Sequence, residues 1–168
     1  MSISPTWDLF VGIFLVIGVV YGFVLQKERV FTALLALYVA SMITSIWSEP
    51  IFNFFQGKSM IGSVWIQANA TPMTIKIAIF GLIFILIAAK APIGYMRSWS
   101  LVSPIEIVVY SILNSLIMVG TLYRYLSPEL QQKIIEQSIF IPKIDLFYNV
   151  LLVVPLVVLM VITSRKSE

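Results

Sequence analysis

Residues 7–25 read WDLFVGIFLVIGVVYGFVL, and this stretch decides the fold class of the chain. Its only charged side chain is Asp8, directly after Trp7. A helix of about 20 mostly apolar residues crosses the hydrocarbon core of a bilayer. Residues 7–25 therefore predict a transmembrane helix.

Four further stretches have the same apolar character, and they predict spans at about 30–47, 72–89, 105–126 and 145–164. The whole chain is 60% apolar and 11% charged, with a mean hydropathy of +0.99. A soluble domain is usually about 45–50% apolar and about 25% charged. We therefore expect an all-α integral membrane protein, in which residues 1–168 form a single bundle of about five transmembrane helices.

Two connections are predicted to lie at the membrane surface. Residues 51–66 are too apolar for a solvated loop and are broken by two glycines, so we expect them to lie in the headgroup region or to dip back into the bundle. Residues 128–141 follow Ser127 and start with Pro128, which is a typical helix start. A helix over these residues would place Leu130, Ile134 and Ile141 on one face. This pattern predicts a short interfacial helix that ends near Pro142.

The distribution of charge predicts an orientation. The chain has 11 Lys and Arg against 8 Asp and Glu, a net charge of +3. Six basic residues fall in the first connection, the third connection and the C-terminal tail, whereas four fall in the second and fourth connections. Because basic residues accumulate on the cytoplasmic side, the N-terminus is predicted outside and the C-terminus in the cytoplasm. The charge is too weak and scattered for a nucleic-acid partner, and membrane lipids are the expected surroundings.

The residue types present exclude several kinds of chemistry. The chain has no Cys and no His, which excludes thiol nucleophiles, Ser-His triads, Cys or His metal sites and haem ligation. A lipid-directed enzyme would need Asp8 or Glu106 as the acid beside a serine nucleophile, and no spacing favours that. We expect no enzymatic activity, no catalytic residues, no metal and no cofactor.

Small residues recur at four-residue spacing in three of the predicted spans. Lipid tails are as apolar as leucine, so helices in a bilayer associate where small residues allow their backbones to approach closely. Each row is predicted to be a helix-packing face within one chain or, alternatively, an oligomer interface. The rows are Gly18 and Gly22; Ala36, Ala40 and Thr44; and Ser111 and Ser115.

Lys76, Glu106 and Asn114 are the polar side chains within predicted spans that we consider for a role in conduction or in a polar path. Lys76 and Glu106 lie near opposite ends of their spans, where they are predicted to anchor the helices at the interface or, alternatively, to take part in conduction. Asn114 lies closest to the midplane and is predicted to form an interhelical hydrogen bond. It could instead line a polar path with Ser111 and Ser115.

Three segments of the sequence resemble the CvpA family, the bacterial colicin V production proteins. The Trp7-Asp8 opening is similar to the acidic start of that family, and residues 18–24 (GVVYGFV) are similar to its Gly-x-x-x-Gly-Phe-Val close. Residues 137–142 (QSIFIP) are similar to the Ser-containing, Pro-ended stretch after its fourth span. The resemblance covers residues 5–145.

The chain also departs from this family. Val19, Val20, Tyr21 and Leu25 stand where the family usually has basic residues, no Arg matches the one in its fourth span, and the fifth span with Pro155 is additional. The resemblance implies an inner-membrane protein in envelope maintenance or export. We expect an accessory or scaffold protein that contacts a second copy or another membrane protein; the alternative is a small oligomeric channel or transporter component.

Overall fold

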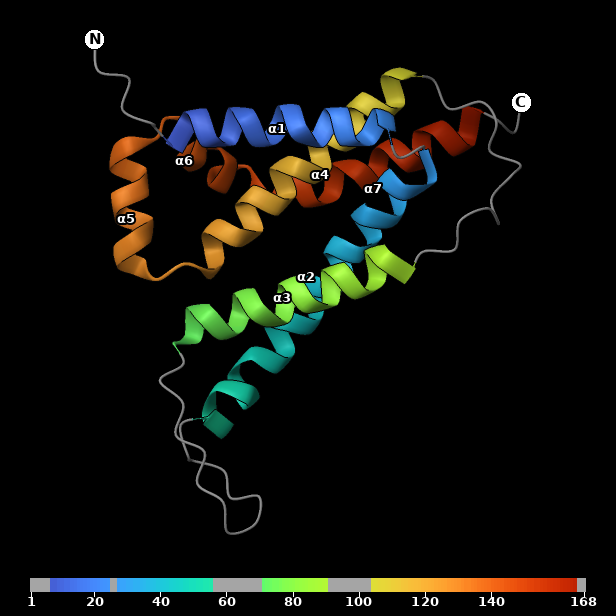
Figure 1. The fold of residues 1–168 in the computed structure, drawn as a ribbon. Helices are drawn as coiled ribbons and strands as arrows, with labels where there is room; N and C mark the ends of the chain where they lie inside the picture. The colour runs from blue at the N-terminus through green and yellow to red at the C-terminus, as the bar shows by residue number, and fades with distance from the viewer. Residues whose placement is uncertain (1–6, 25–26, 56–70, 91–103, 166–168) are drawn as a thin grey trace. The chain divides into compact units, whose positions relative to one another are not determined.

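The computed structural model describes residues 7–24, 27–55, 71–90 and 104–165, and within these ranges the chain is helical without strands (Figure 1). The described helices, in chain order, are α1 (Trp7–Val24), α2 (Lys27–Phe55), α3 (Pro72–Lys90), α4 (Pro104–Tyr125), α5 (Pro128–Gln137), α6 (Phe140–Leu146) and α7 (Tyr148–Arg165).

The expectation of an all-helical chain with about five apolar spans is confirmed in its coarse form. In the described ranges, α1, α2, α3 and α4 are each long and apolar enough to cross a membrane. A fifth crossing is formed if α6 and α7 are taken together, and these two helices meet at a bend of 67°. Length and composition therefore suggest a multi-pass membrane protein.

Three helices begin at a proline that follows a serine or threonine: α3 at Pro72, α4 at Pro104 and α5 at Pro128. Proline suits the first helical position because its missing N–H would have no partner there and its φ is already helical. At the start of α3, Thr71 Oγ1 also accepts a hydrogen bond of 3.2 Å from the N–H of Thr74.

The end of α2 differs from the prediction. We expected this span to end at Trp47 and residues 51–66 to form an interfacial segment, but α2 continues through Pro50 to Phe55. A proline inside a helix removes one backbone hydrogen bond, and spanning helices tolerate this where neighbouring groups satisfy the freed carbonyl. Residues 51–55 are therefore helical, and residues 56–66 lie outside the described residues.

The predicted interfacial helix over 128–141 is two helices. α5 ends at Gln137, and α6 begins at Phe140 with Pro142 in its first turn, where proline is tolerated, so Pro142 does not end the helix. The helix expected from residue 145 onward instead begins at Tyr148, after the bend at Phe147. α7 then continues past Pro155.

The chain divides into two compact units. The first contains α1 together with α4 to α7, and the second contains α3 and the part of α2 from Thr32 onward. That the whole chain forms one bundle stays a prediction.

In the first unit, α1 lies antiparallel against α4, and the contact is made by small residues. Gly18 lies against Ser115, and Gly22 lies against Ser111. A Cβ added at Gly18 would lie 3.3 Å from Ser115 Cβ, and one added at Gly22 would lie 3.1 Å from Ser111 Cβ. Each serine hydroxyl occupies the space where a larger residue would place its side chain, so only glycine allows this separation of the two backbones.

The apolar core of the first unit lies beyond this contact, toward the end where α1 begins and α4 ends. Ile134 of α5 packs there with Ile141 and Ile144 of α6, against α1 and α4. The short helices thus close one end of the α1–α4 pair. The buried members of this core are Val11, Val119, Tyr123, Ile134, Ile141 and Ile144.

Substitutions along α1 test this packing. Gly22→Ala is expected to lower the free energy of unfolding in detergent by about 1–3 kcal/mol, the usual cost of overpacking. Gly18→Ala is expected to cost less, because its new Cβ would lie farther from the serine Cβ. The matched control is Gly12→Ala, whose Cβ would meet no atom within 4 Å. Ser111→Gly should restore stability to Gly22→Ala; equal stability of all three alanine variants would contradict the contact.

Candidate functional site

Polar side chains gather at the end of the first unit where α1 begins, α4 ends and α5 and α6 lie. We call this group the polar cluster, and it joins the ends of several helices through hydrogen bonds and one ion pair. Its members are Asp8, Thr121, Arg124, Gln131, Ser138, Asp145 and Tyr148.

Asp8, in the first turn of α1, binds the junction between α5 and α6. Its carboxylate accepts hydrogen bonds from the hydroxyl of Ser138 and from the backbone N–H groups of Ile139 (3.1 Å) and Phe140 (3.2 Å). Ser138 Oγ in turn accepts a hydrogen bond of 3.1 Å from the N–H of Ile141. The first N–H groups of a helix have no partner within the helix. Asp8 and Ser138 supply those partners for α6.

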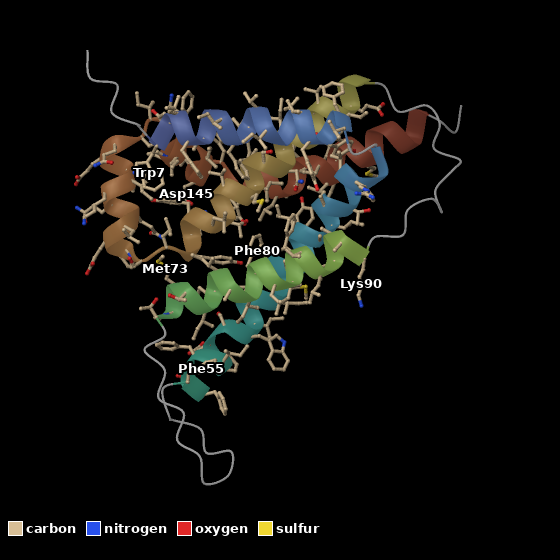
Figure 2. All side chains as sticks on the ribbon, in the orientation of Figure 1. Trp7, Phe55, Met73, Phe80, Lys90 and Asp145 are labelled. Atoms are coloured by element: carbon tan, nitrogen blue, oxygen red, sulfur yellow. The ribbon has the colours of Figure 1, made fainter. Side chains whose placement is uncertain are left out.

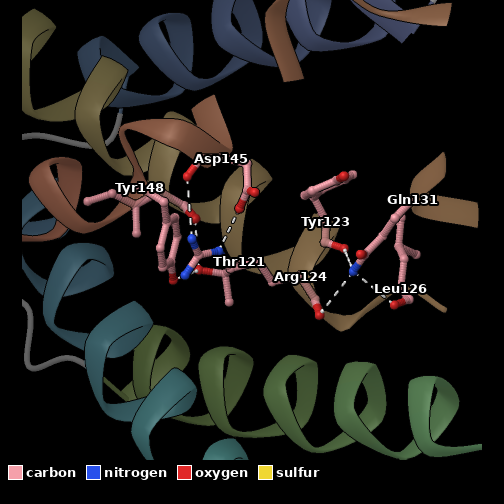
Figure 3. Close-up of polar contacts among 8 residues, drawn as sticks. Thr121, Tyr123, Arg124, Leu126, Gln131, Asp145 and Tyr148 are labelled. Atoms are coloured by element: carbon pink, nitrogen blue, oxygen red, sulfur yellow. Dashed lines mark hydrogen bonds and ion pairs between the residues drawn. The ribbon is translucent and has the colours of Figure 1, made fainter. Parts of the chain in front are cut away.

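Arg124, in the last turn of α4, binds the end of α6. Its Nε lies 2.7 Å from Asp145 Oδ1, and one terminal NH₂ group donates a 3.3 Å hydrogen bond to the Asp145 carbonyl (Figure 3). The guanidinium carbon also lies 4.1 Å from the centroid of the Tyr148 ring, in a cation–π contact. Both charged side chains are 39% exposed, so the ion pair by itself contributes little to stability.

Thr121 and Tyr148 join α4 to the start of α7. Their hydroxyl oxygens lie 2.8 Å apart, and Thr121 also donates a hydrogen bond of 2.8 Å to the carbonyl of Ile117 (Figure 3). Because the threonine proton is used in that way, the tyrosine hydroxyl is the donor between the two. At Gly120, the residue before Thr121, an added Cβ would lie 2.6 Å from Tyr148 Cδ2, so α7 approaches α4 closely at this point.

Gln131 of α5 satisfies carbonyl groups at the end of α4. Its side-chain NH₂ donates 3.1 Å hydrogen bonds to the carbonyls of Tyr123 and Leu126 and lies 3.5 Å from that of Arg124 (Figure 3). The last carbonyls of a helix have no partner within it. The polar cluster therefore satisfies helix ends.

The structure brings together two of the three predicted small-residue rows, since Gly18 and Gly22 meet Ser115 and Ser111. The third row, Ala36, Ala40 and Thr44 of α2, is fully buried. Thr44 Oγ1 has no hydrogen-bond partner among the described residues.

The residues predicted for a polar path lie apart from the polar cluster. Ser111 Oγ, Asn114 Oδ1 and Glu106 Oε2 are buried without a hydrogen-bond partner in the described part of the chain. Glu106 and Asn114 stand two helical turns apart on α4, about 12 Å along its axis. Lys76 lies in the first turns of α3, in the second unit. The described ranges contain no group of three or more acidic, His or Cys side chains that could hold a metal ion.

Sequence reasoning missed the partners within the polar cluster. Arg124 and Asp145 are 21 residues apart with the whole of α5 between them, so no helical spacing relates them. A usable signal was present, because Arg124, Gln131 and Asp145 are polar residues at the ends of apolar helices, where backbone groups need partners.

Comparisons of the chain with protein-family models, curated proteins and solved structures find no match.

The Asp8 contacts yield a prediction about α6. Asp8→Ala is expected to lower the melting temperature in detergent and to expose residues 138–147 to protease, because the first turn of α6 loses its acceptor. Asp8→Asn, which keeps one oxygen acceptor, should lose less. Glu136→Ala on the exposed face of α5 is the control, since it should leave both readouts unchanged. Identical behaviour of Asp8→Ala and Glu136→Ala would contradict the role of Asp8.

The Arg124 contacts yield a second prediction. Arg124→Lys is expected to lower the free energy of unfolding by about 1 kcal/mol, because lysine cannot keep both the Asp145 bond and the flat stacking on Tyr148. Asp145→Asn, which leaves the stacking intact, should cost less. Chemical denaturation in detergent measures both; a larger loss for Asp145→Asn would show that the charge pair, rather than the ring contact, dominates.

Proposed function

We propose that this chain is a CvpA-like accessory or scaffold protein of the inner membrane, which acts through helix–helix contacts in envelope maintenance or export. In this proposal its N-terminus lies outside and its C-terminus in the cytoplasm. Its partners are membrane lipids and either a second copy or another membrane protein, without nucleic acid.

One observation carries the proposal: the hydrogen bonds and the ion pair of the polar cluster join helix ends of the first unit, while the outward face of α1 is apolar. The exposed side chains of α1 include Ile13, Ile17 and Val20, each more than half exposed. Such a surface suits lipid or the face of another membrane helix.

The packing directions support a multi-pass arrangement. α1 runs antiparallel to α4, and these are the first and fourth candidate spans. Two helices separated by two further crossings must run in opposite directions across a membrane. The binding of Asp8 to Ile139 and Phe140 also supports one shared side for the start of α1 and the entry into the fifth crossing.

The Gly18 and Gly22 row has a partner inside the chain, which supports a packing role over an oligomer face. A helix already seated on these glycines leaves no space for a second copy at the same face. We therefore infer that assembly uses the opposite, large-residue face of α1.

A second candidate, a small channel or transporter component, is favoured by the buried and unpartnered Ser111 Oγ and Asn114 Oδ1. A buried polar atom without a partner costs free energy unless water or another polar group reaches it. Both serines of the suggested path, however, face the glycines of α1. A polar path there would require α1 and α4 to separate.

Native mass spectrometry after gentle extraction from the membrane, combined with flux assays in liposomes, separates the two candidates. The scaffold proposal expects a fixed complex with a second copy or one different protein, and no solute flux. Ile17→Trp on the outward face of α1 should reduce that complex, while Gly12→Ala should not.

Extraction as a monomer without partners would contradict the scaffold proposal. Flux that Asn114→Leu abolishes, with assembly unchanged, would instead establish the channel. The control for that variant is Asn149→Leu, which removes an exposed amide at the start of α7.

A further inference from the structure

We propose that α6 lies within the interfacial layer of the membrane and inserts Phe140, Leu146 and the neighbouring Phe147 among the lipid acyl chains of one leaflet. This inference rests on the part of the proposed function in which the long helices cross a membrane. It assigns a lipid-binding surface to a helix too short to span.

Two contacts fix the depth of α6. At its start, the N–H of Phe140 is bound by Asp8, which lies in the first turn of α1. At its end, Asp145 is bound by Arg124, which lies in the last turn of α4. Both ends of α6 are therefore held level with the ends of two candidate spans. If those helices cross the bilayer, α6 lies at its boundary.

The faces of α6 differ in what they meet. Ile141 and Ile144 point into the core of the first unit and are buried. Phe140 is 55% exposed and Leu146 is 76% exposed. Large apolar side chains held at the boundary of a bilayer and turned away from the protein gain most by entering the acyl layer, about 5–10 Å deep for an interfacial helix.

Lys143 suits this placement. It is exposed and stands three residues after Phe140 and four before Phe147, so it shares their face of the helix. A lysine can bury its methylene stem along apolar surface and extend its ammonium group to the water side. At this depth the ammonium group would reach the lipid phosphates.

α5 provides the contrast. Ile134 points into the core, whereas Glu129, Lys133 and Glu136 are exposed. Figure 2 shows nitrogen and oxygen atoms at the tips of the sticks on the outward face of α5, whereas those along α1 are mostly carbon. The exposed face of α5 is therefore mixed, with charged side chains beside Leu130 and Ile135, whereas that of α6 is apolar apart from Lys143.

Lipid is favoured over a second protein as the occupant because this surface continues into others of the same kind. The exposed apolar residues of α6 follow directly into Val150 and Val153 of α7, and α6 packs beside α1, whose outward side chains are also apolar. A protein partner on α6 alone would leave those neighbouring faces in lipid.

Fluorescent labels on single cysteines test the depth of α6, and the full chain suits this because it contains no native Cys. Phe140→Cys and Leu146→Cys are labelled with an environment-sensitive dye in phosphatidylcholine vesicles. Lipids with brominated acyl chains and aqueous iodide serve as the two quenchers. We expect a blue-shifted emission, strong quenching by the brominated lipids and loss of iodide quenching.

The controls are Glu136→Cys on α5, expected to respond to iodide, and Ile17→Cys in the middle of α1, expected to respond to brominated lipid. Iodide quenching at Leu146 equal to that at Glu136 would overturn the inference. Shielding from both quenchers would also overturn it, since a protein would then cover the surface. Failure of Ile17 to respond to brominated lipid would instead contradict membrane insertion, and with it the proposed function.

Discussion

The close approach of α1 and α4 is the contact on which the rest of the first unit depends. Gly18 and Gly22 give the two serine hydroxyls the space that side chains would otherwise fill, and the antiparallel direction of the pair brings Asp8 to the same end as Arg124. In lipid, no hydrophobic free energy is gained when an apolar helix face moves from lipid to another helix. Close packing of small residues therefore has to hold such helices together. The position of α6, bound to one end of each helix, follows from that pairing.

The polar cluster completes what the small residues begin. The contact between α1 and α4 does not determine where α5 and α6 attach, because apolar surfaces can slide over one another. Directional bonds remove that freedom: Asp8 binds N–H groups of α6, Gln131 binds carbonyls of α4, and Arg124 binds the end of α6. The bend of 67° between α6 and α7 then places Tyr148 beneath the Arg124 guanidinium.

Much of the fold could be predicted from the sequence because apolar length alone sets the extent of a spanning helix. The ends of α1, α3 and α4 fall within one residue of the predicted bounds. Pro142 misled the prediction, since a proline ends a helix only when the lost hydrogen bond or the ring clash outweighs the continuing packing, which local sequence does not reveal. The continuation of α2 through Pro50 was missed for the same reason. The small-residue rows could be predicted from their spacing. Spacing within one helix, however, does not show which row packs against which. The polar character of Arg124 and Asp145 at helix ends could be seen, but their pairing could not, because it depends on how α5 and α6 fold back against the end of α4.

The first unit uses small residues in the middle of α1 and α4 and polar side chains at their ends, and this arrangement limits where a partner could bind. A second membrane helix cannot use Gly18 or Gly22 without displacing α4, and it cannot use Asp8 or Arg124 without leaving backbone groups of α6 or the Asp145 carboxylate unsatisfied. What remains is the apolar outward surface, where lipid and protein compete on nearly equal terms. In the proposed scaffold, contacts made there are governed by the fit between apolar faces, so a complex can form without disturbing the fold. A complex held in this way leaves the α1–α4 contact intact, and this favours an accessory protein over a pore whose polar path would require α1 and α4 to separate.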